Sequence, residues 1–513
     1  MRDLVPLLLP LLLFVANLLP PLLPLLLFVA KLLPPLLPLL LFVALNWYNF
    51  TPTKGNEMTI ATVLAAGLLP VIPQPTQWMP AEGECDLATA SVSVAVRADS
   101  GLGEEGYTMK IAPGGIKIVA GGETGRVWAW QTIAQLRAAG AKAPCGDIRD
   151  VPKYRLRGFV MDVARMYHSM DFLRDLARTM SYYKMNTLHV HLNDNEIAPK
   201  NKPDVDWSKM YAAFRMECET YPELTAKDGH YTKKEFREFM LFCKSIGVTV
   251  VPEFDVPAHS LAFTRVKPEF ASAEYGAGHF NLSKSDQILA WLKPLFAEYL
   301  TGTEPVFAGP YMHVGTDEYN KKEAEKFRAF TDAMLKMVAD FGYRPCAWGA
   351  LTHASGKTPV KAGRDVMMDI WYNPYYQPAE ALDAGYTIVS VPDGFVYIVP
   401  YAGYYYDYLN CKYLYESWEP RIVGNYTVPD GYMDKLAGGK FALWNDCLGK
   451  KKNGERYAES DNWDRIYPAL QTLSQKMWTG KRTDQTWGQF AALADAKREP
   501  KGVKSRHKTT LSK

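Results

Sequence analysis

Eight short apolar segments separated by helical patterns follow Pro152, and this alternation constrains the fold more than any other feature of the chain. Such a rhythm is typical of strand–helix units that build one parallel sheet with helices on its outside. Eight units over about 320 residues predict an α/β fold, with a TIM (β/α)8 barrel as the catalytic domain. The expected strands are residues 156–161, 187–192, 248–254, 310–314, 345–348, 366–371, 386–391 and 441–444. Expected helices include residues 172–183, 233–246, 287–299 and 321–341.

A different pattern precedes the barrel. Residues 90–96 alternate between apolar and polar side chains, and residues 107–111 and 116–120 are strand-like segments separated by Pro-Gly-Gly, before a helical pattern at 124–136. We expect a small α+β domain here. It has no cluster of acids, histidines or cysteines, which indicates a structural role. The chain then divides into a leader (1–68), this small domain (69–152), the catalytic domain (153–482) and a basic C-terminal tail (483–513).

The leader is an internal repeat. The segment Leu-Leu-Pro-Leu-Leu-Leu-Phe-Val-Ala begins at Leu8, Leu22 and Leu36. Its prolines each remove a helical hydrogen bond, so a stable transmembrane helix is not expected. Arg2 followed by an apolar run resembles an export signal and favours a secreted or periplasmic protein. A misplaced start or an expanded repeat is the alternative, and Met58 opens a more ordinary segment.

Charge and cysteine content exclude several classes of protein. A net charge of +3 with mixed signs gives no case for a nucleic-acid partner, and the Lys and Arg residues of the last twenty positions suggest a solvated tail. Seven cysteines stand at spacings that fit no zinc site, and their odd number leaves at least one unpaired. We therefore expect neither a disulfide scaffold nor a zinc site.

Polar and tryptophan residues follow most of the expected strands, at the end where barrel enzymes keep their chemistry. A single one of them could be a buried side chain satisfied by hydrogen bonds, but a set at successive strand ends indicates a site. In chain order these residues are Asp162, Arg165, His189, His191, Asp194, Glu253, Asp255, His259, Asp317, Glu318, Trp348, Trp371, Trp444 and Asp446.

Asp317 and Glu318 are adjacent and follow the strand expected at 310–314. Side chains of neighbours leave a strand on opposite faces, so one carboxyl could protonate a leaving oxygen while the other holds a different part of the substrate. Glycosidases that use an enzyme nucleophile need two carboxyls about 5 Å apart across the sugar. An acidic pair favouring a helix start is the alternative for this motif alone.

Six motifs together resemble glycoside hydrolase family 20, the β-N-acetylhexosaminidases, over about Val71 to Met477. The resemblance implies a non-catalytic domain followed by the barrel. It also implies hydrolysis of glycans that carry terminal β-linked N-acetylhexosamine, without a metal or cofactor. The motifs are Arg157-Gly-Phe-Val-Met-Asp-Val-Ala-Arg165, His189-Val-His-Leu-Asn-Asp194, Pro252-Glu-Phe-Asp-Val-Pro-Ala-His259, His313-Val-Gly-Thr-Asp-Glu-Tyr319, Tyr408-Leu-Asn410 and Leu443-Trp-Asn-Asp446.

The same resemblance implies a substrate-assisted retaining mechanism. Glu318 would be the acid that protonates the glycosidic oxygen and then the base that activates water. Asp317 would hold the N–H of the 2-acetamido group, whose oxygen attacks the anomeric carbon. Tyr408 would hydrogen-bond that oxygen. An oriented internal nucleophile and a fixed anion make this division of roles physically sensible.

The remaining site residues carry over in the same way. Asp194 and His259 would relay hydrogen bonds toward Glu318 and tune its proton affinity. The other five would shape the cavity and hold the sugar: Trp348, Trp371 and Trp444 as walls, Arg165 and Asp446 on the hydroxyls at the far side of the ring, and Asn410 near the acetamide.

Two departures from the family pattern matter. Asp446 stands where a glutamate is usual, which could enlarge the far end of the pocket and favour disaccharide release, as in the lacto-N-biosidase branch; Arg165 argues for the single-sugar pocket. Thr316 stands where a second glycine is common, which we interpret as neutral. A metal-dependent amidohydrolase using His189, His191, His259 and Asp317, and an inactive sugar-binding protein, are the alternatives from other classes.

Overall fold

The computed structural model describes residues 67–197, 206–447, 457–480, 484–497 and 499–512. Residues 1–66 of the expected leader lie outside these ranges. In the described part of the chain, no helix combines the length and the apolar character that a membrane crossing requires.

The small domain expected before the barrel is an α+β unit. Its five-stranded sheet has the order β1-β5-β3-β4-β2, with β2 and β4 parallel, and one helix packs against it. The three strands and the helix expected from the sequence are confirmed, whereas β1 and β5 were not predicted. Most of β1 is exposed, so its sequence lacks the apolar alternation that identifies a strand. The elements are β1 (Gln77–Asp86), β2 (Ser91–Val96), β3 (Tyr107–Ala112), β4 (Gly115–Ala120), α5 (Glu123–Ala139) and β5 (Lys142–Asp150).

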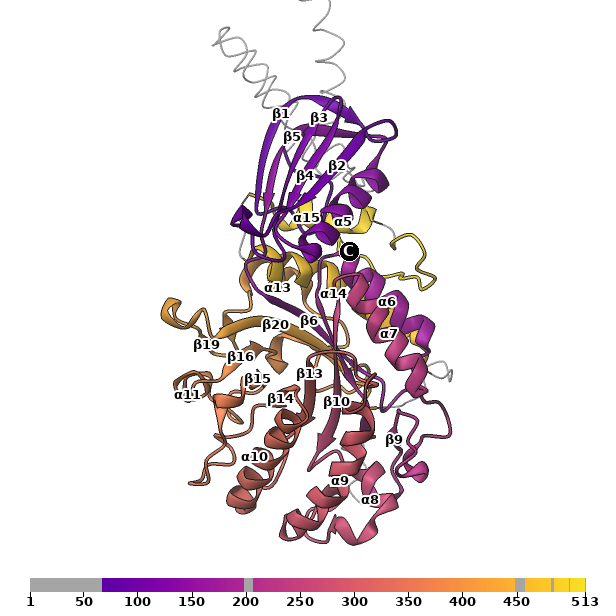
Figure 1. The fold of residues 1–513 in the computed structure, drawn as a ribbon, viewed down its shortest axis with the longest axis vertical. Helices are drawn as coiled ribbons and strands as arrows, with labels where there is room; N and C mark the ends of the chain where they lie inside the picture. The colour runs from indigo at the N-terminus through magenta and orange to yellow at the C-terminus, as the bar shows by residue number, and fades with distance from the viewer. Residues whose placement is uncertain (1–66, 198–205, 448–456, 481–483, 498, 513) are drawn as a thin grey trace, which may run out of the picture. The chain divides into compact units, whose positions relative to one another are not determined.

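The predicted TIM barrel is confirmed. Eight parallel strands follow one another around the barrel, and pairing of β16 with β20 and of β20 with β6 closes it (Figure 1). Each overlaps one of the eight expected segments. The last strand begins five residues before the expected 441, because two glycines, Gly438 and Gly439, hide its apolar pattern. The strands are β6 (Leu156–Asp162), β7 (Thr187–His191), β10 (Thr249–Val256), β13 (Tyr311–Gly315), β14 (Arg344–Trp348), β15 (Met367–Ile370), β16 (Thr387–Ser390) and β20 (Leu436–Leu443).

Helices flank these strands, and short strands occupy the loops (Figure 1). The four expected helices are confirmed within a few residues, the last as a 3₁₀ turn followed by α10. The helices are α6 (Met170–Tyr182), α7 (Lys233–Ser245), α8 (Leu261–Val266), α9 (Ser285–Leu300), α10 (Ala324–Asp340), α11 (Pro378–Asp383), α12 (Asp393–Val396), α13 (Cys411–Ser417), α14 (Glu459–Thr479) and α15 (Trp487–Ala496). The short strands are β8 (Asn193–Asn195), β9 (Ala212–Phe214), β11 (Ala271–Ser272), β12 (Gly276–Phe280), β17 (Tyr397–Ile398), β18 (Ile422–Val423) and β19 (Tyr426–Thr427).

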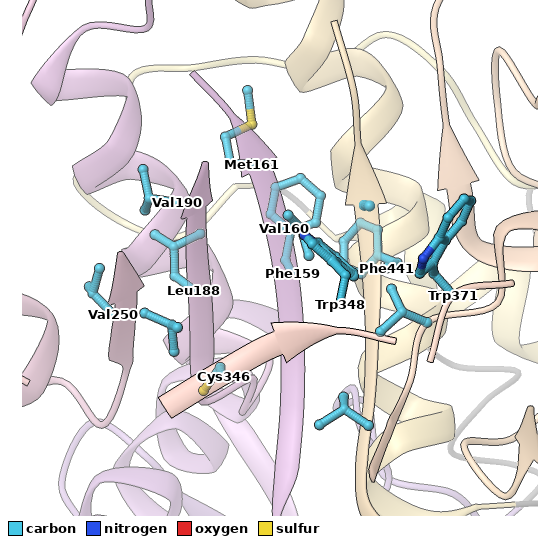
Figure 2. Packing of buried hydrophobic residues seen from close by; sticks show 14 of the residues in the cluster. Phe159, Val160, Met161, Leu188, Val190, Val250, Cys346, Trp348, Trp371 and Phe441 are labelled. Atoms are coloured by element: carbon cyan, nitrogen blue, oxygen red, sulfur yellow. The ribbon is translucent and has the colours of Figure 1, made fainter. Parts of the chain in front are cut away.

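The barrel strands are buried on both faces, as parallel strands covered by helices must be. Every residue of β6 and of β20 is buried. The rings of Phe159 and Phe441, from these neighbouring strands, lie 4.3 Å apart (Figure 2). Trp348 from β14 is also buried within this packing. The interior of the barrel is thus filled with side chains.

A buried carboxylate joins the small domain to the barrel. Asp150, at the end of β5, accepts hydrogen bonds from the Trp478 indole at 2.6 Å and from the Lys184 ammonium at 2.7 Å. Arg157 at the start of the barrel pairs with Glu105 and lies over the Trp478 ring. Because these charges are buried with partners, separating the domains would leave them unpaired, which is strongly unfavourable.

The C-terminal tail is attached to the catalytic domain, although Lys501, Lys504, Arg506 and Lys508 are exposed, as expected for a solvated segment. Helix α15 packs on α13, with the Tyr415 and Phe490 rings stacked 4.5 Å apart. Beyond it, three aspartates each accept hydrogen bonds from two consecutive backbone N–H groups. Asp175 receives those of residues 504 and 505, Asp464 those of 508 and 509, and Asp495 those of 511 and 512. This attachment was not predicted, because Asp175 and Asp464 lie far from the tail in sequence.

The backbone turns sharply at the end of β13. Gly315 has φ +70°, and a Cβ there would lie 1.6 Å from Oδ1 of Asp255, so only glycine fits. Thr316 follows with φ 69°, although a β-branched residue is strained in this region, and its hydroxyl is buried without a hydrogen-bond partner. The expectation that Thr316 is neutral is therefore wrong, since a glycine at this position would be free of strain.

Replacement of Thr316 by glycine should therefore stabilise the protein. We expect Thr316→Gly to raise the free energy of unfolding by about 1 kcal/mol, because a left-handed backbone costs a non-glycine residue about 1–2 kcal/mol. Chemical denaturation measures the change. Thr301→Gly is the matched control: Thr301 has φ −118°, so glycine should destabilise there. A stability loss in Thr316→Gly equal to that of the control would contradict the strain.

Candidate active site

A cavity of about 430 Å³ opens at the carboxyl ends of the barrel strands, where the site was expected. Carboxylates, a guanidinium, imidazoles and aromatic rings line it, a mixture suited to a polar ligand with apolar faces. The lining residues are Arg165, His191, Asp194, Ile197, Asp255, His259, Asp317, Glu318, Trp371, Tyr397, Tyr404, Tyr405, Trp444 and Asp446. Eight of the eleven site residues predicted from the sequence are among them.

The turn after β13 presents the two acidic side chains differently. The side chain of Glu318 is 46% exposed, whereas that of Asp317 is 15% exposed. Oδ1 of Asp317 is buried without a hydrogen-bond partner. Burial raises the pKa of Asp317 to about 6. The charge of His259 opposes this rise, and the nearby negative charge of Glu318 adds to it. Oδ1 of Asp317 can therefore accept a hydrogen bond that no described residue donates to it. Glu318, in contrast, is exposed to solvent.

The predicted relay from Asp194 through His259 to Glu318 is present in the geometry. Nδ1 of His259 lies 2.8 Å from Oδ1 of Asp194, and its Nε2 lies 3.4 Å from Oε2 of Glu318. Burial disfavours a charged imidazole, but the nearby carboxylates, Asp194 first, raise the pKa of His259 well above 6.5. Burial likewise disfavours ionised Glu318, yet hydrogen bonding and charge from His259 hold the pKa of Glu318 below its usual value. His259 thus controls the charge of Glu318.

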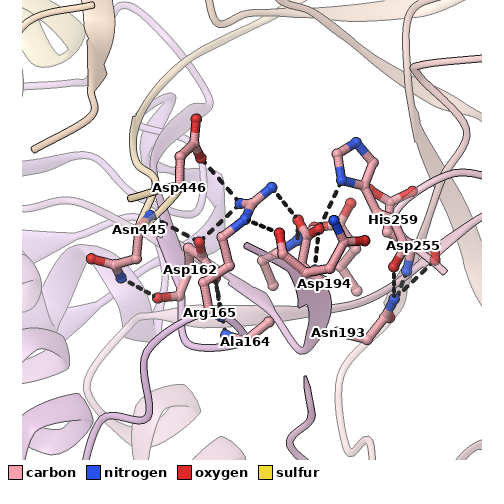
Figure 3. Close-up of polar contacts among 12 residues, drawn as sticks. Asp162, Ala164, Arg165, Asn193, Asp194, Asp255, His259, Asn445 and Asp446 are labelled. Carbon is pink, nitrogen blue, oxygen red and sulfur yellow. Dashed lines mark hydrogen bonds and ion pairs between the residues drawn. The ribbon is translucent and has the colours of Figure 1, made fainter. Parts of the chain in front are cut away.

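The predicted pair Arg165 and Asp446 lies on the other side of Asp194 from His259 (Figure 3). Arg165 forms ion pairs with Asp162 at 3.0 Å, Asp194 at 2.7 Å and Asp446 at 3.3 Å. The Tyr404 hydroxyl donates to the other oxygen of Asp446 at 2.7 Å. Both oxygens of the short Asp446 side chain are therefore engaged, and Tyr404 borders the space next to it.

Two of the three predicted tryptophan walls line the cavity, and the third lies beneath it. Trp371 and Trp444 lie on the cavity surface. Trp348 is buried below them, where its indole donates to Glu253 at 2.7 Å and its ring lies 5.7 Å from that of Trp444. Trp348 therefore supports the wall without forming part of the cavity surface.

The predicted placement of Tyr408 and Asn410 in the cavity is wrong. Tyr408 is 37% exposed, and its hydroxyl donates to Asp464 at 2.9 Å. Asn410 caps α13 through the backbone N–H of Tyr413 at 3.1 Å. Both line a separate cavity next to the C-terminal segment. Their side chains are committed to fixing that segment and a helix end, away from Asp317 and Glu318.

Tyr397 is a cavity-lining tyrosine that was not predicted from the sequence. It belongs to β17, which pairs with β20, and its ring lies parallel to Trp371 at 6.4 Å and 5.8 Å from Trp444. Burial raises the pKa of Tyr397 well above 10. The nearby ionisable groups of Tyr405, Asp393 and Asp317 add to this rise. Tyr397 therefore remains a neutral hydroxyl donor. The one signal for Tyr397 in the sequence is its position between two apolar residues, Val396 and Ile398, at the start of the tyrosine-rich loop.

Other cavity residues carried weaker signals in the sequence. Asp255 stands at an expected strand end but was given no role, and His191 was considered only as a metal ligand in the amidohydrolase alternative. Tyr404 and Tyr405 lie among many tyrosines in one loop, and nothing in their spacing distinguishes those that face the cavity.

The metal-site alternative is not supported by the hydrogen bonds of the histidines. Nε2 of His189 lies 3.0 Å from Glu253, and its Nδ1 faces Lys440 at 3.3 Å. His191 contacts Glu253 through Nδ1 and Asp194 through Nε2. With both ring nitrogens of each histidine engaged, the His189–His191 pair offers no free nitrogen to an ion.

Comparisons with known proteins agree with this geometry. The family model described as "Glycosyl hydrolase family 20, catalytic domain" matches residues 154–481, and "Glycosyl hydrolase family 20, domain 2" matches residues 86–151. A β-hexosaminidase of Akkermansia muciniphila is 29% identical over 310 residues, which are 55% of this chain and 59% of the relative. A lacto-N-biosidase of Bifidobacterium bifidum is 23% identical over 77% of this chain and 35% of its own length.

The fold is also found in solved structures. The crystal structure of a β-N-acetylhexosaminidase from Bacteroides fragilis has a TM-score of 0.64 at 20% identity, with 81% of this chain and 92% of that chain covered. The two family models together account for the small domain and the barrel. On these matches, the chain belongs to glycosyl hydrolase family 20.

Proposed function

We propose that this chain is an exo-acting β-N-acetylhexosaminidase, which removes terminal β-linked N-acetylhexosamine from glycans by substrate-assisted retaining catalysis. The observation that carries the proposal is the placement of two adjacent carboxyls in one aromatic cavity. Oδ1 of Asp317 is buried and accepts no hydrogen bond from the described residues, while Glu318 is half exposed and faces His259. A buried acceptor suits a neutral N–H of the substrate, and an exposed acid suits a leaving group that departs to solvent.

The reaction begins with the sugar between Trp371 and Trp444, whose rings match the apolar face of a pyranose. Asp317 accepts the acetamide N–H, and the Tyr397 hydroxyl donates to the acetamide oxygen. This places the oxygen beneath the anomeric carbon, so that the attack is intramolecular and needs no enzyme nucleophile. Asp317 also stabilises the positive charge that develops on the acetamide as the glycosidic bond breaks.

Glu318 donates the proton to the leaving oxygen. Sugar in the cavity displaces water from the carboxyl and so favours its neutral form. After the aglycone leaves, Glu318 as carboxylate takes a proton from the water that opens the cyclic intermediate. His259, held by Asp194, compensates the negative charge that Glu318 acquires in the first step.

Release of a single sugar is favoured over release of a disaccharide. The shorter Asp446 leaves space, but Tyr404 borders that space and hydrogen-bonds Asp446, while Arg165 holds its other oxygen. Tyr404, Asp446 and Arg165 present atoms that can bind hydroxyl groups at the far wall of the cavity. This arrangement suits the terminal sugar of a glycan. We further propose, from the signal-like leader, that the protein is exported.

The activity is tested with two aryl glycosides, an N-acetyl-β-glucosaminide and a lacto-N-bioside. The wild type should hydrolyse the first, and Glu318→Gln should lose about three orders of magnitude in kcat/KM because it cannot transfer a proton. Binding of an oxazoline-type inhibitor to the variant controls for folding. Cleavage of the disaccharide glycoside alone would refute single-sugar release, and full activity of the variant would refute the role of Glu318.

Two tyrosine variants test the assignment of the acetamide donor. Tyr397→Phe should lower kcat/KM about a hundredfold, since it removes one donor from the oxygen that becomes the nucleophile. Tyr408→Phe is the matched control and should leave kcat/KM unchanged, because its hydroxyl contacts Asp464 outside the cavity. The reverse pattern, with only Tyr408→Phe impaired, would restore the interpretation drawn from the sequence motif.

A further inference from the structure

Two carboxyl groups, those of Asp255 and Asp317, lie close together in the cavity. Oδ1 of each is buried and accepts no hydrogen bond from the residues that the structure describes. A carboxylate oxygen of each, together with a ring nitrogen of His259, lies within 4.8 Å of the others. Two ionised carboxylates this close and out of water repel strongly, so the arrangement requires either a proton or a cation.

Asp255 cannot turn away from its neighbour. It lies at the end of β10 and is 1% exposed. Asn193 fixes its backbone on both sides, accepting from its N–H at 2.8 Å and donating to its carbonyl at 2.9 Å. Its Oδ1 occupies the space next to the backbone of Gly315, where a Cβ would lie only 1.6 Å away. The side chain is thus packed against the turn that presents Asp317.

Charged groups from three elements surround the pair. Glu253 lies on β10 itself, His191 on β7, and Glu318 on the turn after β13. The two nearby cations are shared with other carboxylates. His191 contacts Glu253 and Asp194. Nδ1 of His259 contacts Asp194, and its Nε2 lies 3.4 Å from Glu318 and 3.8 Å from Oδ1 of Asp317. Their charge is shared with at least two other carboxylates, so it does not suffice for both Asp255 and Asp317.

A metal ion bound between Asp255 and Asp317 is the less favoured way to relieve their repulsion. The third group that would bind it is His259, whose Nδ1 contacts Asp194 at 2.8 Å and whose pKa is raised well above 6.5. A protonated imidazole has no lone pair for a metal and repels it. The repulsion is instead relieved if one of the two carboxyls carries a proton. Asp255 is the more completely buried of the two, at 1% exposed against 15% for the Asp317 side chain.

We propose that Asp255 stays protonated through neutral pH and directs its proton toward Asp317, acting as a positioning residue for it. The pair then carries one negative charge, located on Asp317, which meets the substrate amide as a single oriented anion. This inference deepens the proposed function, on which it rests. Burial and the charge of Asp317 raise the pKa of Asp255 well above its usual range, in agreement with the assignment.

Infrared spectroscopy detects such a proton directly. The wild type carrying carboxyl-¹³C-labelled aspartate should show a protonated aspartic acid band at pH 8, where Asp317, with a pKa of about 6, is ionised. The band should be absent from labelled Asp255→Asn and retained in the matched variant Asp393→Asn, which removes a carboxyl of raised pKa away from this pair. A wild-type spectrum with only carboxylate bands would overturn the proposal without any variant.

The pH dependence of kcat/KM gives the second readout. The wild type should lose activity below about pH 6 as Asp317 is protonated. Asparagine imitates a neutral Asp255, so the acid limb of Asp255→Asn should stay within about half a pH unit of the wild type, even if the rate falls. A downward shift of about one unit or more would mean that an ionised Asp255 had been removed, and would overturn the proposal. Failure of the proposed function is distinguishable, since the infrared result does not depend on activity.

Discussion

The site depends on one buried carboxylate, Asp194, and the three partners that surround it. Arg165, His191 and His259 each bring a nitrogen within 2.7 to 2.8 Å of its two oxygens. These contacts hold the pKa of Asp194 far below its usual value, although burial alone would raise it. Asp194 is therefore a fixed anion that connects the wall binding the sugar hydroxyls to the imidazole serving Glu318.

A second layer of buried charge lies beneath this one inside the barrel. Glu253 contacts His189, His191, His313 and the indole of Trp348. Below it, Lys440 forms an ion pair with Asp369. Buried charges are costly unless each has partners, and their usual benefit is a single defined arrangement. Here the arrangement orients His191 and Trp348, which in turn support Asp194 and Trp444.

The sequence predicted the barrel well because its signal is local and repeated. Each strand is a continuous apolar run, as burial on both faces requires, and each is followed by polar or aromatic residues at the same edge. Eight of the eleven predicted site residues line the cavity for this reason, among them Arg165 and Glu318. Trp348 was predicted on the correct strand but lies one layer deeper than the cavity wall expected for it, because a strand pattern does not say which layer of the barrel a side chain enters.

Long-range packing explains the other errors. A tyrosine-rich loop offered several candidates for one role, and the choice of Tyr397 over Tyr408 depends on pairing of β17 with β20, which no local pattern shows. The C-terminal segment is basic and polar, yet it is held by Asp175 and Asp464, which are remote in sequence, and by Asp495 of α15. The strain at Thr316 follows from the close approach of Asp255 to the adjacent glycine, which also requires the fold.

The central claim is that the substrate's own amide oxygen attacks the anomeric carbon. The most direct measurement is kcat/KM for a series of aryl glycosides whose 2-acetamido group carries zero to three fluorine atoms, since each fluorine makes the amide oxygen less nucleophilic. The account predicts a steep and continuous fall along the series, by orders of magnitude, with no hydrolysis of the 2-hydroxy sugar. Rates that are independent of fluorination would contradict it.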